Sequence, residues 1–271
     1  MVRKSAPTVQ RRTDTNSALQ MGTGAPSNGP MKTCFDGLLE HSSTHHRIFA
    51  LEYRVSSAAP FPASNPFPAC LLDALAGYRY LVHDVGFDPE NIVISGDSAG
   101  GLLAFALAYY LATHSGELPV PLPNAGGLLL LSPTVDWAVS DGAGPQTSMR
   151  RHARSDFVEA ILMSGYTRRA LLGRLPEETA ATSIYISPGS QRLPITPGMF
   201  AGLPRTCIVA GGAEQTLDPM RVLKDRMAED LGDRVLWIET PDATHDFFTA
   251  SWHEPERTNT LKEVGAWLAG L

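Results

Sequence analysis

The sequence predicts an α/β fold in which a mostly parallel sheet carries helices on both faces. Short, largely apolar segments alternate along the chain with longer segments whose apolar residues recur at helical spacing. Residues 133–203 interrupt this alternation, which then resumes. Strands that alternate with helices are joined by crossover connections, and these produce a parallel sheet with covered faces. We therefore expect an α/β domain with an excursion that forms a partial cap.

Five segments are predicted as strands. The first, R-I-F-A-L-E-Y-R-V at 47–55, is rich in β-branched and aromatic residues. N-I-V-I-S at 91–95 and G-G-L-L-L-L at 126–131 are apolar runs of the kind that a parallel sheet buries on both faces. The strands at 206–210 and 235–239 resume the pattern after the interruption.

Five helices separate or follow these strands, and the spacing of their apolar residues identifies them. They are expected at 69–84, 99–113, 156–172, 217–231 and 255–271. The clearest is the fourth, in which Leu217, Met220, Leu223, Met227 and Leu231 recur every three or four residues and form one apolar face.

The composition excludes several classes of protein. Of 271 residues, 43% are hydrophobic and 18% charged, which suits a sizeable core and differs from a disordered chain. A net charge of −6 gives no general attraction to nucleic acid, and no apolar run is long enough for a transmembrane helix. Three scattered cysteines (Cys34, Cys70 and Cys207) cannot form a disulfide framework or a four-thiolate metal site.

The chain is expected to divide into an irregular N-terminal segment, residues 1–46, and an α/β domain, residues 47–271, that includes the cap-like excursion at 133–203. Residues 21–30 are rich in Gly, Pro and Ser, a composition typical of loops. Residues 1–20 carry four basic side chains but no apolar core, so they do not resemble a secretory signal. We therefore expect a cytoplasmic protein.

The sequence G-D-S-A-G-G at 96–101 follows a predicted strand and opens a predicted helix. It matches the nucleophile elbow, G-x-S-x-G, in which a serine occupies a tight strand-to-helix turn and its hydroxyl projects above the sheet. The helix N-terminus then offers its positive dipole end, and the amide of Ala99 can donate to a developing oxyanion. Ser98 is therefore the candidate nucleophile.

A serine nucleophile needs a histidine base that a carboxylate orients, and after such an elbow the chain order is serine, acid, histidine. His245 is the favoured base, because it lies in the loop directly after the strand at 235–239. His152 precedes the strand that should carry the acid, and His253 lies at a helix start, where a solvated or capping role is the better interpretation.

Two acids follow the strand at 206–210. Glu214 lies nearer to the strand end and is favoured, whereas Asp218 could instead cap the next helix and remains the alternative. Asp73 and Asp136 precede this strand and are interpreted as structural acids.

Six segments carry motifs that occur together in one group of enzymes. They are E-Y-R at 52–54, N-P-F-P-A-C-L-L-D-A at 65–74, G-D-S-A-G-G at 96–101, L-S-P-T-V-D at 131–136, G-A-E-Q-T-L-D at 212–218 and H-D-F at 245–247. From about residue 48 onward the chain thereby resembles the hormone-sensitive-lipase branch of the α/β-hydrolase esterases. The resemblance implies an α/β-hydrolase fold, ester hydrolysis and Glu214 as the catalytic acid.

One motif of that family is missing. The family carries H-G-G-G ahead of its D-Y-R segment, and the glycine amides of this motif complete the oxyanion hole. No H-G-G-G occurs here, and residues 22–24 (G-T-G) correspond only to the loop after it. In the family, the strand that leads into this motif lies inside the sheet, between the strands that 47–55 and 91–95 represent. We expect residues 1–20 to be too polar and too short to supply it.

Either the chain is an N-terminally shortened form, or its N-terminal segment substitutes for the missing part. In a shortened form, hydrolysis would be weakened, and the unpaired strand edge would open a route to aggregation or to a homodimer. The leading interpretation is an esterase that acts on a small-molecule ester through an acyl-enzyme, with no metal or organic cofactor. The alternative is a weakened or inactive relative that binds small molecules. A peptidase of related fold is disfavoured by the segments at 52–54 and 65–74.

Overall fold

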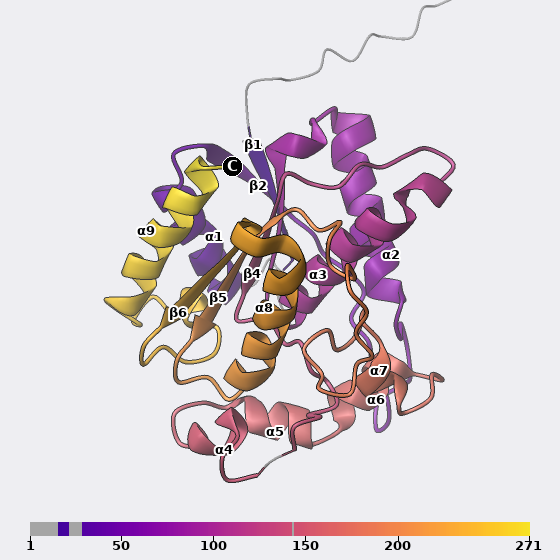
Figure 1. The fold of residues 1–271 in the computed structure, drawn as a ribbon, viewed down its shortest axis with the longest axis vertical. Coiled ribbons are helices and arrows are strands. Elements are labelled where there is room, and N and C mark those ends of the chain that lie inside the picture. The colour runs from indigo at the N-terminus through magenta and orange to yellow at the C-terminus, as the bar shows by residue number, and fades with distance from the viewer. Residues whose placement is uncertain (1–15, 22–28, 143) are drawn as a thin grey trace, which may run out of the picture.

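The computed structural model describes residues 16–21, 29–142 and 144–271. Its centre is a six-stranded sheet in the order β2-β1-β3-β4-β5-β6, in which every neighbouring pair is parallel (Figure 1). The strands are β1 (Asn16–Met21), β2 (His45–Ala50), β3 (Ile92–Asp97), β4 (Gly127–Leu131), β5 (Arg205–Gly211) and β6 (Val235–Thr240). The predicted fold class is confirmed.

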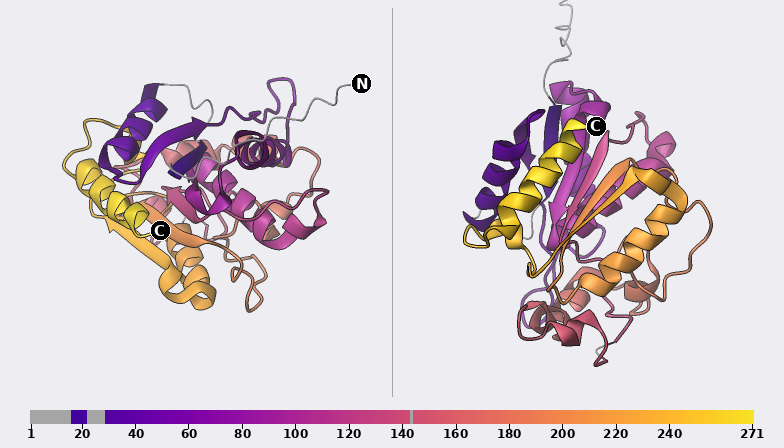
Figure 2. Two further views of the ribbon diagram at one scale, coloured as in Figure 1. Left: turned by 90° about the horizontal axis from the view of Figure 1, so that it is seen from above. Right: turned by 60° about the vertical axis from the view of Figure 1, so that its left-hand side comes forward.

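Helices cover both faces of this sheet, as Figures 1 and 2 show. One face carries α1 (Gly29–His41) and α9 (Glu256–Ala269), which pack against each other. The other face carries α2 (Ala69–Arg79), α3 (Ser98–His114) and α8 (Leu217–Leu231). The fourth predicted helix is confirmed with both of its ends, because α8 spans the predicted residues.

The central strands divide their side chains between two apolar cores, one on each face. In β3, Ile92 and Ile94 join the core under α2, α3 and α8, whereas Val93 joins the core under α1 and α9. Strands β4 and β5 alternate in the same way. Because successive side chains of a strand point to opposite faces, a strand buried on both faces must be apolar throughout, which explains the runs seen in the sequence.

The excursion between β4 and β5 contains four short helices, which lie beyond one end of the sheet, at the bottom of Figure 1. They are α4 (Ser148–Arg151), α5 (Val158–Met163), α6 (Tyr166–Leu172) and α7 (Thr179–Thr182). The expectation of one helix over 156–172 is wrong, because Gly165 has φ +65° and separates α5 from α6. A residue in this left-handed conformation cannot continue a right-handed helix.

Two other elements differ from the prediction toward their C-terminal ends. The helix expected at 69–84 is α-helical only to Arg79 and continues as a π-helical turn from Tyr80 to Val85. The strand expected at 47–55 ends at Ala50, which pairs with Gln20 near the end of β1. Because β2 lies at the edge of the sheet, its only neighbouring strand is β1, and the backbone pairing of β2 stops where β1 ends.

The N-terminal expectation is wrong for the residues that the structure describes. Residues 1–46 are not irregular throughout, because they contain β1 and α1. Strand β1 lies between β2 and β3 and pairs with both, which is the place that we expected to stay empty. Backbone pairing on two sides is available to any non-proline sequence, so the polar character of N-S-A-L-Q-M does not prevent it. The unpaired edge from which we expected dimerisation is therefore filled.

Within the described residues, no helix is long and apolar enough to cross a membrane.

The carboxyl ends of the strands point toward α4–α7, and the loops that leave these ends carry the candidate residues (Figure 1). A parallel sheet gathers ligand chemistry at this edge.

Candidate active site

Ser98 occupies a tight turn between β3 and α3. Its φ of +48° places it in the left-handed region, which a serine adopts only where the surroundings enforce it. Neighbouring glycines allow the turn: a Cβ on Gly96 would stand 2.0 Å from the carbonyl oxygen of Gly100, and one on Gly101 would stand 2.7 Å from the Cβ of Pro133. Glycine is thus required sterically at positions 96 and 101.

The three residues of the predicted serine, histidine and acid set lie in one hydrogen-bonded chain. Ser98 Oγ lies 2.8 Å from His245 Nε2, and His245 Nδ1 lies 2.9 Å from Glu214 Oε2. Glu214 follows β5 and His245 follows β6. A Cβ on Gly211 would stand 2.2 Å from the carbonyl oxygen of Ala243, so this glycine lets the two loops approach each other.

Glu214 is fully buried and receives three further hydrogen bonds. Its Oε1 accepts from Ser132 Oγ at 2.6 Å and from the backbone N–H of Gly211 at 2.6 Å. Its Oε2 accepts from Thr216 Oγ1 at 3.1 Å, beside His245. Because all of these groups donate, both oxygens of Glu214 serve as acceptors, and His245 Nδ1 carries the proton that lies between the two side chains.

Asp218 does not reach His245. Its Oδ2 accepts from the backbone N–H of Ser148 at 2.6 Å, and its Oδ1 pairs with Arg151 at 2.9 Å. It is not the N-cap of α8 either, because the helix begins at Leu217 after Thr216 and Asp218 is already its second residue.

The other acids and histidines considered from sequence lie in separate contacts. Asp73 accepts from both Nε and Nη2 of Arg54, and Asp136 accepts from Ser140 within its own turn. His253 stacks on Trp252, and its Nε2 lies 3.4 Å from the backbone N–H of Thr244. The contacts of Asp73, Asp136 and His253 therefore stabilise the surrounding fold, and none of the contacts named here involves Ser98.

A second carboxylate adjoins His245. Asp246 Oδ1 lies 3.4 Å from His245 Nε2, on the side of the ring that faces Ser98. Burial opposes protonation of His245, but the charges of Asp246, Glu214 and Asp156 outweigh it and raise the pKa of the imidazole above its usual range. On Asp246 burial has the opposite effect and raises the pKa of the carboxyl group, to about 6. The imidazolium is therefore strongly stabilised here.

The expected oxyanion donor lies where the elbow predicts. Ala99 is the second residue of α3 and lines the pocket beside Ser98. Its N–H belongs to the first turn of the helix, whose amides have no partner within the helix and carry the positive end of its dipole. Residues 22–24, which follow β1 directly, lie outside the described residues.

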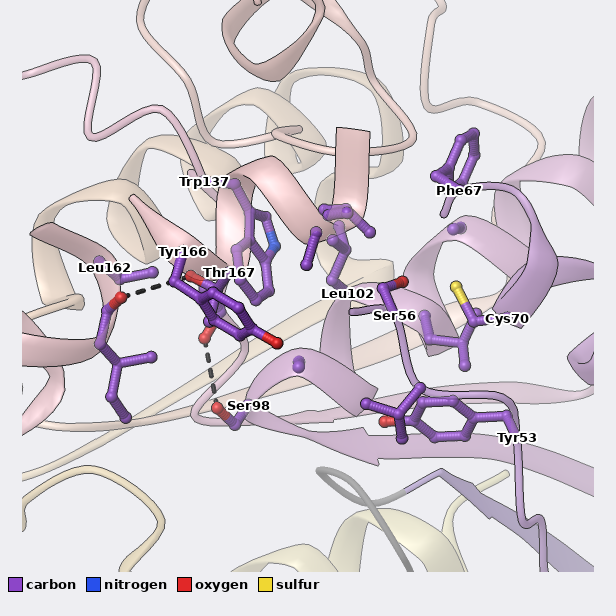
Figure 3. A pocket seen from close by; sticks show the side chains of 18 of the residues that line it. Tyr53, Ser56, Phe67, Cys70, Ser98, Leu102, Trp137, Leu162, Tyr166 and Thr167 are labelled. Carbon is purple, nitrogen blue, oxygen red and sulfur yellow. Dashed lines mark hydrogen bonds between the residues drawn. The ribbon is translucent and has the colours of Figure 1, made fainter. Parts of the chain in front are cut away.

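An apolar pocket of about 300 Å³ opens above Ser98. Figure 3 shows Ser98 with Trp137 and Tyr166 above it in this view and Cys70 and Tyr53 to one side. The walls come from two sources: α2, α3 and the chain after β2 on one side, and the segment with α5 and α6 on the other. Phe157 also packs edge-on against the His245 ring, with centroids 5.8 Å apart.

Sequence reasoning did not single out Ser132, Thr134, Thr216 or Asp246 as site residues. Ser132 and Thr134 directly follow β4, so the rule that chemistry collects at the carboxyl ends of parallel strands could have found them. In the chain that the structure describes, no group of three or more His, Cys, Asp or Glu residues is arranged to hold a metal ion.

The fold and this arrangement define a class of protein: a parallel α/β sheet with an elbow serine, a histidine and an acid on successive loops. A family model described as alpha/beta hydrolase fold matches residues 38–249, and the chain belongs to this family.

Two of the named relatives are a mycobacterial and a streptomycete protein. The chain is 32% identical to the esterase LipU of Mycobacterium tuberculosis over 199 residues, which are 72% of this chain and 60% of LipU. It is 30% identical to an acetyl-hydrolase of Streptomyces hygroscopicus over 224 residues, 82% of this chain and 64% of that protein. The chain thus spans less than two thirds of the length of these curated relatives.

Among solved structures, a hormone-sensitive lipase from a metagenome library superimposes with a TM-score of 0.71 and 26% identity, covering 96% of this chain and 80% of that one. The resemblance stated from the motifs, to esterases of the hormone-sensitive-lipase type, is confirmed.

Proposed function

We propose that the protein hydrolyses carboxylic esters through an acyl-enzyme, with Ser98 as nucleophile, His245 as general base and acid, and Glu214 as the acid of the triad. The observation that carries this proposal is the chain of hydrogen bonds, 2.8 Å and 2.9 Å long, that joins these residues at the base of an apolar pocket. The names of the two relatives, an esterase and an acetyl-hydrolase, support the same reaction.

In the proposed acylation, Ser98 Oγ forms a bond to the ester carbonyl carbon while its proton passes to His245 Nε2. The tetrahedral intermediate collapses, the bond to the alcohol oxygen breaks, and the alcohol leaves with the proton from His245. The acyl group stays on Ser98. Glu214 holds the Nδ1 proton of His245 and stabilises the imidazolium while it exists.

Deacylation repeats the sequence with water. His245 Nε2 takes a proton from a water molecule whose oxygen bonds to the acyl carbon, and the bond from that carbon to Ser98 Oγ then breaks as Oγ regains a proton from His245. In both halves, negative charge develops on the former carbonyl oxygen. We assign the backbone N–H of Ala99, in the first turn of α3, as one donor to it.

The pocket favours compact esters. Its volume of about 300 Å³ lies at the small end of the range for ligand sites, and its walls are mostly apolar. We propose that residues 133–203 act as a partial cap, because this segment contributes Trp137, Val158, Leu162 and Tyr166 to the walls. Short acyl groups joined to small or aryl alcohols fit such a space.

The test is Ser98→Ala, with Ser251→Ala as the control, since Ser251 is an exposed serine remote in sequence from the elbow. We expect Ser98→Ala to lower hydrolysis of p-nitrophenyl acetate by at least about a thousandfold and to abolish labelling by a fluorophosphonate probe. Its unfolding midpoint should stay close to that of the wild type, and Ser251→Ala should change none of these.

Hydrolysis at the wild-type rate by Ser98→Ala would refute the assignment. A folded wild-type chain that neither takes the label nor hydrolyses the ester would point instead to the small-molecule-binding alternative.

A further inference from the structure

A threonine hydroxyl lies beside the nucleophile. Thr134 Oγ1 is 3.3 Å from Ser98 Oγ, and the backbone N–H of Thr134 donates to the carbonyl oxygen of Ser98 at 2.9 Å. Thr134 is 3% exposed and lines the pocket. Two contacts from one residue to the same serine hold this hydroxyl against the reacting atom.

The position of Thr134 is fixed by the chain around it. Ser132, which precedes it by two residues, is held by its bond to Glu214. Pro133 packs against the start of α3 where Gly101 leaves room for it. Residues 132–134 are thereby held in place by Glu214 on one side and by the turn that carries Ser98 on the other.

Counting protons sets the direction of the Thr134 bond. The carboxylate of Glu214 accepts from His245 Nδ1, so Nε2 of a neutral His245 has no proton and must accept from Ser98 Oγ. A serine hydroxyl has one proton to give. When His245 is neutral, which is the form that can act as a base, the bond between the hydroxyls therefore runs from Thr134 Oγ1 to Ser98 Oγ, and Ser98 Oγ is an acceptor on this side.

We propose that Thr134 is a catalytic residue whose hydroxyl stabilises negative charge on Ser98 Oγ, chiefly when that oxygen leaves during deacylation. This inference rests on the proposed ester hydrolysis. In the acyl-enzyme, Ser98 Oγ is an ester oxygen without a proton, so it can only accept a hydrogen bond. A donor there assists cleavage of the bond between Oγ and the acyl carbon, since that cleavage moves the electron pair onto Oγ.

The separation of 3.3 Å is long for a bond between hydroxyls. Hydrogen bonds in resting active sites are often long and shorten as charge develops, because a charged acceptor binds a donor more strongly than a neutral one. The geometry thus fits a donor that acts most on the leaving oxygen and least on the resting hydroxyl.

The experiment compares Thr134→Val, which keeps the shape and removes the hydroxyl, with Thr134→Ser, which keeps the hydroxyl. Stopped-flow release of p-nitrophenol from p-nitrophenyl acetate gives the acylation rate constant. Decay of the acetyl-enzyme, followed by intact-protein mass spectrometry after quenching, gives the deacylation rate constant. Measuring both constants directly makes the result independent of which step limits the wild type.

We expect Thr134→Val to lower the deacylation rate constant by about tenfold, as suits one lost hydrogen bond, and to change the acylation rate constant by less than about threefold. The acetyl-enzyme should then accumulate, and Thr134→Ser should restore rapid decay. Fluorophosphonate labelling of Thr134→Val should persist, which shows that the nucleophile is intact.

Equal losses in both rate constants would mean that Thr134 only packs against the elbow, and no loss would mean that the contact is idle; either result overturns the inference. If the wild type itself forms no acetyl-enzyme, the proposed function fails instead, which is a separate outcome.

Discussion

Ser148 of α4 and Asp218 of α8 bind each other twice. The backbone N–H of Ser148 donates to Asp218 Oδ2 at 2.6 Å, and the backbone N–H of Asp218 donates to Ser148 Oγ at 3.1 Å. Each side chain accepts a hydrogen bond from a backbone N–H in the first turn of the other helix. The first N–H groups of a helix have no partner within the helix, so these two bonds stabilise both helix starts. Asp218 therefore ties the excursion between β4 and β5 to the main domain.

This pairing separates the two candidate acids by experiment. We expect Glu214→Gln to lower kcat by about three to four orders of magnitude, because the amide cannot hold His245 in the same tautomer or stabilise its charged form. Asp218→Asn should leave kcat within a few-fold and lower the free energy of unfolding by about 1 kcal/mol or less, because its ion pair with Arg151 is partly exposed. Ester hydrolysis and urea denaturation of both variants provide the measurement. Reversed phenotypes would make Asp218 the acid.

The charge of Asp246 should appear in the pH dependence of hydrolysis. His245 must be unprotonated to accept a proton, and its pKa is raised by neighbouring carboxylates. Activity should therefore fall on acidification through a midpoint above about 6.5, the ordinary value for histidine.

Asp246→Asn removes one of these charges and should move that midpoint of kcat/KM to lower pH, by about one unit or more. Asp242→Asn, in the same loop but exposed, serves as the control and should leave the midpoint in place. A midpoint that Asp246→Asn does not move, or moves upward, would contradict the role given to Asp246.

Gly96 should not tolerate replacement by a larger residue. A methyl group there would stand 2.0 Å from the carbonyl oxygen of Gly100, which is closer than two such atoms can approach. The backbone of Gly96 is held in β3 and that of Gly100 in α3, so neither can easily move away. We expect Gly96→Ala to cost more than about 3 kcal/mol of folding free energy, or to prevent folding. Gly116→Ala is the matched control, since nothing lies within 4 Å of the added carbon.

Chemical denaturation of both variants tests this, with hydrolysis as a second reading. A Gly96→Ala protein as stable as Gly116→Ala would mean that the elbow can widen without loss.

The sequence was sufficient to predict the hydrogen-bonded serine, histidine and acid, for physical reasons. The elbow requires glycines at fixed offsets from Ser98, and the order of the strands limits where its partners can stand. His245 and Glu214 were then selected by their nearness to strand ends, and these are the two that the structure joins to Ser98.

Strand β1 could not be predicted, because its place in the sheet depends on two neighbours that supply backbone partners rather than on an apolar pattern of its own. Thr134 and Asp246 were missed for a related reason. Each contacts an atom of a residue already selected, Ser98 or His245, and local sequence does not show which side chains make such contacts. The break at Gly165 was missed because apolar spacing continues across it.

The two sources of the pocket walls have a consequence for how such a protein can change. Ser98, Glu214 and His245 sit at the ends of sheet strands, whereas Trp137, Tyr166 and their neighbours belong to one continuous stretch of chain between β4 and β5. Val135, Phe200 and Leu203 of the same stretch belong to the core under α2, α3 and α8. We expect its pocket-lining part to be exchangeable without moving a strand, provided that these core residues, Ser132, Thr134 and the partner of Asp218 are kept. Selection, or an engineer, can therefore alter which esters enter while leaving the chemistry in place.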